Sequence, residues 1–138
     1  MISVYDASLI QFPQILDIRG NLTFIEQERH IPFKIARVYW IYDVPGGEQR
    51  GEHAFRDQEE VIIALSGSFD VFLDDGNAQK IVHLNRAYHG LYVPRMIWRR
   101  MQNFSTNAVA YVLANYPFTT GDYIRDYREY KALMQEGK

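Results

Sequence analysis

Residues 47–67 read GEQRGEHAFRDQEEVIIALSG, and this stretch decides the fold. His53 and Phe55 are two residues apart, so in an extended strand their side chains point to the same face. The apolar run Val61–Leu65 follows and stops at the turn signal SGS of residues 66–68. The stretch therefore predicts two neighbouring strands, the first of which turns His53 and Phe55 towards one side of a sheet.

Short strands separated by turn residues continue on both sides of this stretch. The sequence DDGN at residues 74–77 is typical of a hairpin turn, because Asp-Gly and Gly-Asn accept positive φ at low cost. Near the end of the chain, TGD at residues 120–122 precedes tyrosines at helical spacing and predicts a helix over Tyr123–Met134. The predicted strands cover Leu22–Glu26, Ile35–Val44, Glu60–Leu65, Phe69–Leu73, Lys80–Leu84, Gly90–Val93, Ile97–Met101 and Val109–Ala114.

Composition excludes several classes of function. The 138 residues fit one domain over residues 1–138, and 47% of them are hydrophobic, enough to form a core. The net charge of −2 argues against nucleic acid as a partner. Because the chain has no cysteine, disulfides, thiolate metal sites and cysteine nucleophiles are excluded. With no basic signal segment at the N-terminus and no apolar run of membrane-spanning length, we expect a cytoplasmic protein without membrane contact.

The spacing within the opening stretch is specific. Gly47, His53, Glu60 and Gly67 are spaced as in the first sequence signature of the cupins, and Phe55 stands where that signature has a second histidine. The resemblance implies an all-β cupin, which is a double-stranded β-helix or jelly-roll barrel, here with a short C-terminal helix. In such a barrel His53 and Phe55 face the interior.

A second, partial cupin signature follows one hairpin later. Pro94 and Asn103 match it, whereas Met96 replaces a glycine and Arg99 replaces a histidine. Metal-binding cupins hold their ion with three histidines and a glutamate, and this chain keeps only His53 and Glu60 of those four ligands. Two protein ligands rarely hold Zn²⁺ or Fe²⁺, and Arg99 places a cation close to the metal position. We therefore expect no metal and no cofactor.

Further segments match one particular family within the cupins. Among them are DIRGNL at residues 17–22, LDDG at 73–76 and DYIR at 122–125. With them the chain resembles the dTDP-4-keto-6-deoxy-hexose 3,4-ketoisomerases, the WxcM-like sugar ketoisomerase family, over nearly its whole length. The resemblance implies a cytoplasmic isomerase of surface-polysaccharide biosynthesis. Such an enzyme moves a carbonyl group between C4 and C3 of a nucleotide-linked 6-deoxy sugar through an enediol. It also implies a homodimer in which the N-terminal strand joins the partner's sheet.

Candidate site residues follow from strand parity and from the resemblance. His53 is the predicted catalytic base, because histidine accepts and donates protons near neutral pH. Either Arg37 and Tyr39 or Trp40 and Tyr42 face the cavity, and the family match favours the first pair. The predicted substrate-binding residues are Arg19, Arg37, Tyr39, Arg50, Glu60, Tyr92, Trp98 and Arg99. Of these, Tyr92 and Trp98 either stack on the ligand or belong to the core. Arg19 either binds the diphosphate or pairs with Asp17. Glu60 is predicted to be a hydrogen-bonding partner for a cavity arginine.

The chain departs from the family motif at one point. The family reads Arg-Gly-x-His-Ala-His, and its second histidine is the implied proton shuttle, whereas this chain has Phe55 there. Phenylalanine carries no proton. The sequence leaves three hypotheses open. The protein is a ketoisomerase that works through His53, a cupin that binds the sugar nucleotide without turnover, or an isomerase or epimerase of another keto sugar.

Overall fold

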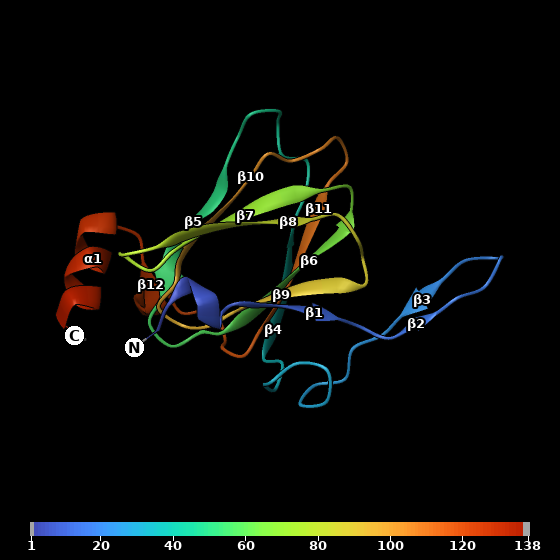
Figure 1. The fold of residues 1–138 in the computed structure, drawn as a ribbon, viewed down its shortest axis with the longest axis horizontal. Helices are drawn as coiled ribbons and strands as arrows, with labels where there is room; N and C mark the ends of the chain where they lie inside the picture. The colour runs from blue at the N-terminus through green and yellow to red at the C-terminus, as the bar shows by residue number, and fades with distance from the viewer. Residues whose placement is uncertain (1, 137–138) are drawn as a thin grey trace.

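Two five-stranded antiparallel sheets lie face to face and form a barrel (Figure 1). The structure, a computed structural model, describes residues 2–136; Met1, Gly137 and Lys138 of the predicted domain lie outside the described residues. The first sheet has the order β1 (Ser8–Gln11), β9 (His89–Val93), β6 (Glu60–Ser66), β11 (Val109–Ala114) and β4 (Arg37–Ile41). The second has the order β12 (Tyr123–Ile124), β5 (Arg50–Phe55), β10 (Trp98–Gln102), β7 (Phe69–Asp74) and β8 (Gln79–Leu84).

Smaller elements surround the barrel. A separate hairpin of β2 (Gln14–Ile15) and β3 (Leu22–Thr23) projects away from it on the side opposite to the C-terminal helix (Figure 1). The 3₁₀ helices η1 (Val4–Asp6) and η2 (Thr120–Asp122) precede β1 and β12, and α1 (Tyr127–Glu136) closes the described chain. No helix within residues 2–136 is both long and apolar enough to cross a membrane.

The predicted all-β barrel with a short C-terminal helix is confirmed, and each of the eight predicted strands is present. Two of them are shorter than predicted, since Leu22–Glu26 keeps only its first two residues and Ile35–Val44 is reduced to Arg37–Ile41. The predicted hairpin turn joins β7 to β8, and the Asp74 and Asp75 carboxylates accept backbone N–H bonds inside it. The strands β1, β2 and β12 were missed because two to four residues are too few to show a periodic pattern.

The predicted helix over Tyr123–Met134 begins later than expected, at Tyr127. Asp126 precedes it and its carboxylate accepts the backbone N–H groups of Arg128 and Glu129, as an N-cap does. Tyr123 and Ile124 instead pair with Phe55 and Ala54 of β5. The tail therefore first completes the second sheet and only then turns into a helix.

The core fills the space between the two sheets. Inward-facing residues such as Ile62, Val71 and Val112 belong to one buried cluster, and their neighbours in sequence point outwards. The strand β6 is buried on both faces along Glu60–Ala64, because a loop segment with Ile31 and Phe33 covers its outer side. This double burial explains why β6 reads as an uninterrupted apolar run rather than an alternating one.

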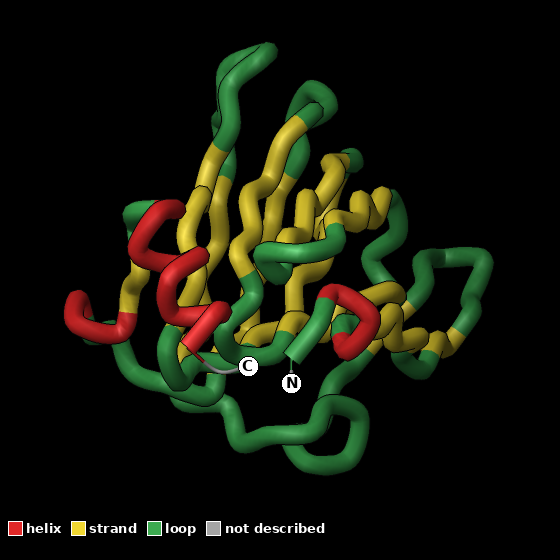
Figure 2. The backbone as a smooth tube through the Cα atoms, turned by 60° about the vertical axis from the view of Figure 1, so that its left-hand side comes forward, coloured by secondary structure: helices red, strands yellow, loops and turns green. Residues whose placement is uncertain are grey.

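The helix α1 packs on the outer face of the second sheet, outside the barrel (Figure 2). Tyr130 and Trp98 are buried together there with Ala54 and Ile124. The Tyr130 hydroxyl lies within hydrogen-bonding distance of the backbone carbonyl oxygens of Asp74 (3.0 Å) and Met96 (2.9 Å), between which it shares its one proton, and this fixes the helix to the ends of β7 and β10.

Gly90 of β9 allows Phe12 to pack closely against the outer side of the first sheet. A Cβ atom at this position would lie 2.6 Å from Cζ of Phe12 and 2.7 Å from Cγ1 of Val61, both buried. Gly90→Ala should therefore lower the free energy of unfolding by about 1–3 kcal/mol through overpacking, as measured by urea denaturation. Gly121→Ala, whose Cβ meets nothing within 4 Å, is the matched control and should change stability by less than about 0.5 kcal/mol. Equal stability of the two variants would contradict this account of the packing.

Candidate active site

A cavity of about 560 Å³ opens where β4 of the first sheet faces β5 and β12 of the second. Inward-facing residues of these strands and of β10 line it, because the side chains alternate along each strand. The lining includes Arg37, Tyr39, Arg50, His53, Arg99 and Tyr123. Trp40 touches the rim, but 57% of its surface is exposed on the outer side of β4.

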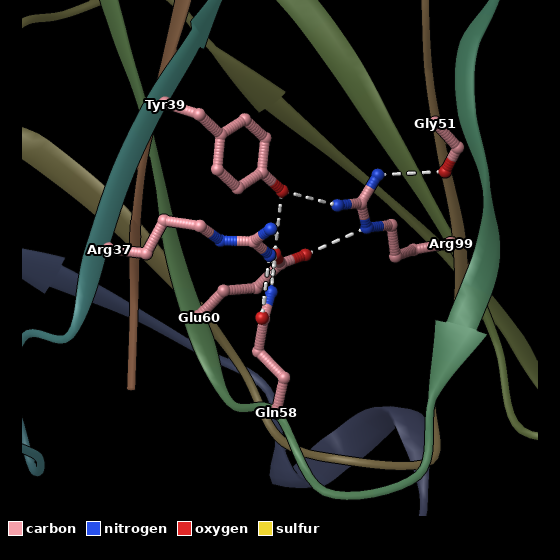
Figure 3. Close-up of polar contacts among 6 residues, drawn as sticks. All are labelled: Arg37, Tyr39, Gly51, Gln58, Glu60 and Arg99. Carbon is pink, nitrogen blue, oxygen red and sulfur yellow. Dashed lines mark hydrogen bonds and ion pairs between the residues drawn. The ribbon is translucent and has the colours of Figure 1, made fainter. Parts of the chain in front are cut away.

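Arg99 lies completely buried at the base of this cavity, and each nitrogen of its guanidinium has a partner (Figure 3). Nε donates to Oε1 of Glu60 at 2.7 Å, Nη1 to the carbonyl oxygen of Gly51 at 2.7 Å, and Nη2 to the hydroxyl of Tyr39 at 2.9 Å. Burial opposes the charge of Arg99, but Glu60 and Tyr39 outweigh it and raise the pKa of the guanidinium. Arg99 is therefore a permanent cation at the base of the cavity.

Glycine at position 51 is required by this arrangement. Its φ of +68° lies in the left-handed region, and a Cβ there would come within 2.2 Å of Nη1 of Arg99. Any larger residue would push the guanidinium out of its bonds to Glu60 and Tyr39. The Arg-Gly pair of the sequence thus makes room for an arginine that lies 48 residues further along the chain.

Hydrogen bonds extend from Arg99 across the wall of the cavity (Figure 3). The Tyr39 hydroxyl donates to Oε2 of Glu60 at 2.9 Å, and the Gln58 side chain donates to the same oxygen at 3.2 Å. Nη2 of Arg37 in turn donates to Oε1 of Gln58 at 2.7 Å. Burial, followed by the charge of Glu60, raises the pKa of Tyr39 above its usual range. Tyr39 is therefore held as a neutral hydroxyl whose hydrogen bonds are already made.

His53 faces the cavity with no hydrogen-bond partner for its buried Nε2 within residues 2–136. Its ring centroid lies 4.6 Å from that of Phe55 and 4.8 Å from that of Tyr123. Burial, followed by the charges of Arg99, Arg125 and Arg37, lowers the pKa of His53 from 6.5 to about 2. His53 is therefore a neutral imidazole at physiological pH and can accept a proton.

Three further arginines give the cavity a positive charge. Arg37, Arg50 and Arg125 line it, and none of them forms an ion pair within the described part of the chain. The Arg37 guanidinium lies 5.1 Å from the centre of the Tyr39 ring, and its buried Nε has no acceptor among the described residues. Arg125 lies 4.3 Å from the centre of the Tyr123 ring. Such unpaired guanidinium groups suit an anionic ligand, since arginine binds phosphate oxygens in a bidentate manner.

Six of the nine predicted site residues lie at this cavity. His53, Arg37, Tyr39, Arg50 and Arg99 line it, and Glu60 bonds to Arg99 behind them.

The other three predicted residues lie elsewhere in the chain. Trp98 is 3% exposed and packs between β10 and α1, on the outer side of the second sheet. Tyr92 donates a hydrogen bond to Glu59 on the outer side of the first sheet, and Arg19 pairs with Asp17 at 2.8 Å in the exposed β2–β3 hairpin. Of the two alternatives that the sequence left open for Trp98 and Tyr92, packing in the core is the one that matches their positions within a single chain, because both point away from the barrel interior.

Sequence reasoning missed Gln58, Tyr123 and Arg125. The signal for the last two was their separation by two positions, which places them on one face of an extended segment. The helical spacing of Tyr123 with later tyrosines hid this signal. Gln58 lies in the loop between β5 and β6, and no sequence pattern points to it.

The donor set does not fit a metal ion. Within residues 2–136 no three His, Asp or Glu side chains are grouped closely enough to hold one. The carboxylate of Glu60 is bound to Arg99, and Arg99 lies directly opposite His53 in the β5–β10 ladder.

Comparisons with known proteins agree with this geometry. The chain matches the family described as FdtA, WxcM-like, C-terminal, over residues 5–135. It is 44% identical over 126 residues to TDP-4-oxo-6-deoxy-α-D-glucose-3,4-oxoisomerase of Aneurinibacillus thermoaerophilus, and the match covers 91% of each chain. The sugar 3,4-ketoisomerase QdtA of Thermoanaerobacterium thermosaccharolyticum, solved with TDP, superposes with a TM-score of 0.95 at 37% identity and 98% coverage of each chain. A histidine-to-asparagine mutant of QdtA, solved with TDP-4-keto-6-deoxyglucose, superposes with a TM-score of 0.94 at 36% identity and 97% coverage of each. The expected cupin fold is thereby confirmed.

The low pKa of His53 has a consequence for stability in acid. Between pH 6.5 and about 2 the unfolded chain binds a proton at His53 that the folded chain does not bind, so the free energy of unfolding falls as the pH falls. From pH 7.5 to 5.0 the wild-type protein should lose up to about 2 kcal/mol more than His53→Gln in urea denaturation. His89→Gln, a histidine outside the cavity, controls for the loss of one histidine and should behave like the wild type. Parallel pH curves for His53→Gln and the wild type would contradict the assignment of a neutral His53.

Proposed function

The chain belongs to the FdtA family of WxcM-like, C-terminal proteins, and from this premise we propose that it is a 3,4-ketoisomerase of a TDP-linked 4-keto-6-deoxy sugar. The observation that carries the proposal is that the neutral His53 faces a cavity lined by arginines, and that neither its Nε2 nor the arginines other than Arg99 have an ionic partner within residues 2–136. Such a cavity offers a base for carbon acid chemistry and cations for a diphosphate. Surface-polysaccharide biosynthesis in the cytoplasm, which consumes such sugars, is the predicted setting.

Proton transfer at carbon is the chemistry that His53 supports. The C4 carbonyl makes the proton on C3 acidic, and a neutral imidazole can remove it. The resulting enediol regains a proton at C4, and the carbonyl group is left on C3. One imidazole that serves both carbon atoms starts and finishes neutral, and a general base of this kind contributes about 10²–10⁴-fold to the rate.

The diphosphate is assigned to the arginines at the entrance of the cavity. Arg37, Arg50 and Arg125 have no acidic partner within the described residues, whereas the charge of Arg99 is balanced by Glu60. An anion at the first three therefore gains interactions without breaking an existing ion pair. Arg99 then lies deeper, beside the position of the sugar ring, where its fixed charge stabilises developing negative charge on oxygen.

Two variants of QdtA support the choice of His53 as the base. In one QdtA variant, solved with TDP-4-keto-6-deoxyglucose, a histidine is replaced, and in a second variant an arginine is replaced. The number of positions between this histidine and this arginine equals the number between His53 and Arg99. This equal separation supports a correspondence of that QdtA histidine with His53 rather than with position 55. Phe55 removes the second histidine of the family motif and leaves this one in place.

The other readings of Phe55 are a sugar-nucleotide-binding cupin without turnover and an isomerase or epimerase of a different keto sugar. Phe55 is buried beside His53 and 5.6 Å from the Arg99 guanidinium, so it shapes the cavity without exchanging protons. Turnover with the 4-keto-6-deoxy sugar distinguishes the three readings.

NMR of TDP-4-keto-6-deoxyglucose in D₂O tests the proposal. The wild-type protein should catalyse entry of deuterium at C3 and form a 3-keto product, and His53→Asn should lower the rate by about 10²–10⁴-fold because the base is lost. His83→Asn, an exposed histidine on β8, is the matched control and should retain the wild-type rate.

Saturable binding of the sugar nucleotide with no exchange above the blank would rule out the enzyme and leave the binding protein. In that case Phe55→His is informative. A gain of exchange would identify a ketoisomerase that has lost its second histidine, and no gain would favour different chemistry.

We further propose that the protein is a homodimer. The β2–β3 hairpin exposes Ile15, Leu16 and Ile18, and an isolated two-stranded hairpin is at best marginally stable in water. The outer face of the first sheet exposes Trp40 and Leu65 in an apolar groove. A second copy accounts for both surfaces, since the hairpin of one chain can cover the sheet of the other. It also gives Arg19 a route to the partner's cavity.

Sedimentation velocity tests this assembly. The wild type should sediment as twice the 16.2 kDa chain mass, and Leu65→Glu should shift it to the monomer because a charge on the covered face is costly. Ile81→Glu, an equally exposed position on β8 of the other sheet, should leave the dimer intact. A monomeric wild type at micromolar concentration would contradict the proposal.

A further inference from the structure

The proposed isomerisation needs a proton on oxygen as well as on carbon. When C3 loses its proton, O4 gains one, and before the carbonyl forms at C3, O3 must lose one. His53 can serve the two carbon atoms, but a second group is needed for the two oxygens. Phe55 cannot be this group, so another polar side chain of the cavity must supply it.

Most polar side chains of the cavity already form hydrogen bonds with one another. The Tyr39 hydroxyl donates to Glu60 and accepts from Arg99, and Gln58 bonds both Glu60 and Arg37. Glu60 is held by Arg99 at the base of the cavity. None of these groups can exchange a proton with a ligand without breaking the network around the buried guanidinium.

Tyr123 is different. It lines the cavity, it is only half-buried, and its hydroxyl makes no hydrogen bond to another described residue. Its ring centroid lies 4.8 Å from that of His53. The ionisable groups that face it are His53 from β5, Tyr39 from β4 and Arg125 from the segment after β12.

The strand pairing relates Tyr123 directly to the altered motif. Tyr123 of β12 is the cross-strand partner of Phe55 of β5, and their ring centroids are 4.6 Å apart. Cross-strand partners on one face of a sheet point in the same direction. The hydroxyl of Tyr123 therefore enters the cavity beside the position where the family motif has its second histidine.

We propose that Tyr123 is the group that exchanges protons with the O3 and O4 atoms of the substrate, in place of the side chain missing at Phe55. This inference rests on the proposed function. As His53 takes the proton from C3, the C3–H electron pair forms the C3=C4 bond, and the π pair of the C4 carbonyl takes the Tyr123 proton at O4. The Tyr123 oxygen then removes the proton from O3, whose electron pair forms the C3 carbonyl, while C4 takes the proton back from His53. Both side chains end in their starting states.

Tyr123→Phe tests the assignment, because it keeps the ring beside His53 and Phe55 and removes only the hydroxyl. Its kcat for TDP-4-keto-6-deoxyglucose should fall by about 10²-fold or more, with KM within about threefold, since the proton is needed only in the transition state. Tyr127→Phe, which removes a tyrosine hydroxyl bonded to Asp74 outside the cavity, is the matched control and should keep the wild-type kcat.

Calorimetric binding of TDP to all three proteins reports whether the variants are folded. A Tyr123→Phe variant that binds TDP and keeps kcat within threefold of the wild type would overturn the role of Tyr123 and leave the ketoisomerase intact. A wild-type protein without turnover would overturn the proposed function and this inference together.

Discussion

A buried guanidinium group is the constraint on which the site depends. Removing a charge from water costs several kcal/mol per ion, and the cost is offset only when partners with good geometry surround it. Arg99 has such partners in Glu60, Gly51 and Tyr39, with donor–acceptor distances of 2.7–2.9 Å. These partners come from β6, β5 and β4, so the single group on β10 ties both sheets together beside the cavity.

The properties of His53 follow from the same group. Arg99 lies opposite His53 in the β5–β10 ladder, and its charge, together with burial and two more arginines, keeps the imidazole neutral. The arginines of the cavity therefore have two effects. They attract an anionic ligand, and they prevent the base from being protonated before the ligand arrives. An anion bound at Arg37 and Arg125 reduces their influence on His53, which favours proton uptake by the base when substrate is present.

Side-chain parity explains which site residues could be predicted. His53 and Phe55 point inwards as their spacing indicates, and Glu52 between them points outwards, where it pairs with Arg100. Parity also placed Arg37 and Tyr39 on one face of β4. Parity does not say which side of a strand another element covers, so the sequence left Trp98 between the cavity and the core, and α1 buries it on the face opposite to the cavity. Tyr123 was assigned to the helix because its spacing to Tyr127 and Tyr130 fits a helical period as well as its spacing to Arg125 fits a strand.

The sequence by itself determined the all-β barrel, the hairpin turn at residues 74–77, the inward-facing His53 and the loss of a proton-carrying side chain at Phe55. These features depend on residues that are close together in the chain, where turn chemistry and the two-residue period of a strand are sufficient. Only the tertiary structure decided that Arg99 is neutralised by Glu60, that Gly51 makes room for it, and that Tyr123 lies beside Phe55. In these relations the two partner residues are separated by 39 to 68 positions in the chain. They depend on which strands become neighbours when the two sheets close into a barrel, and no local sequence pattern contains this information.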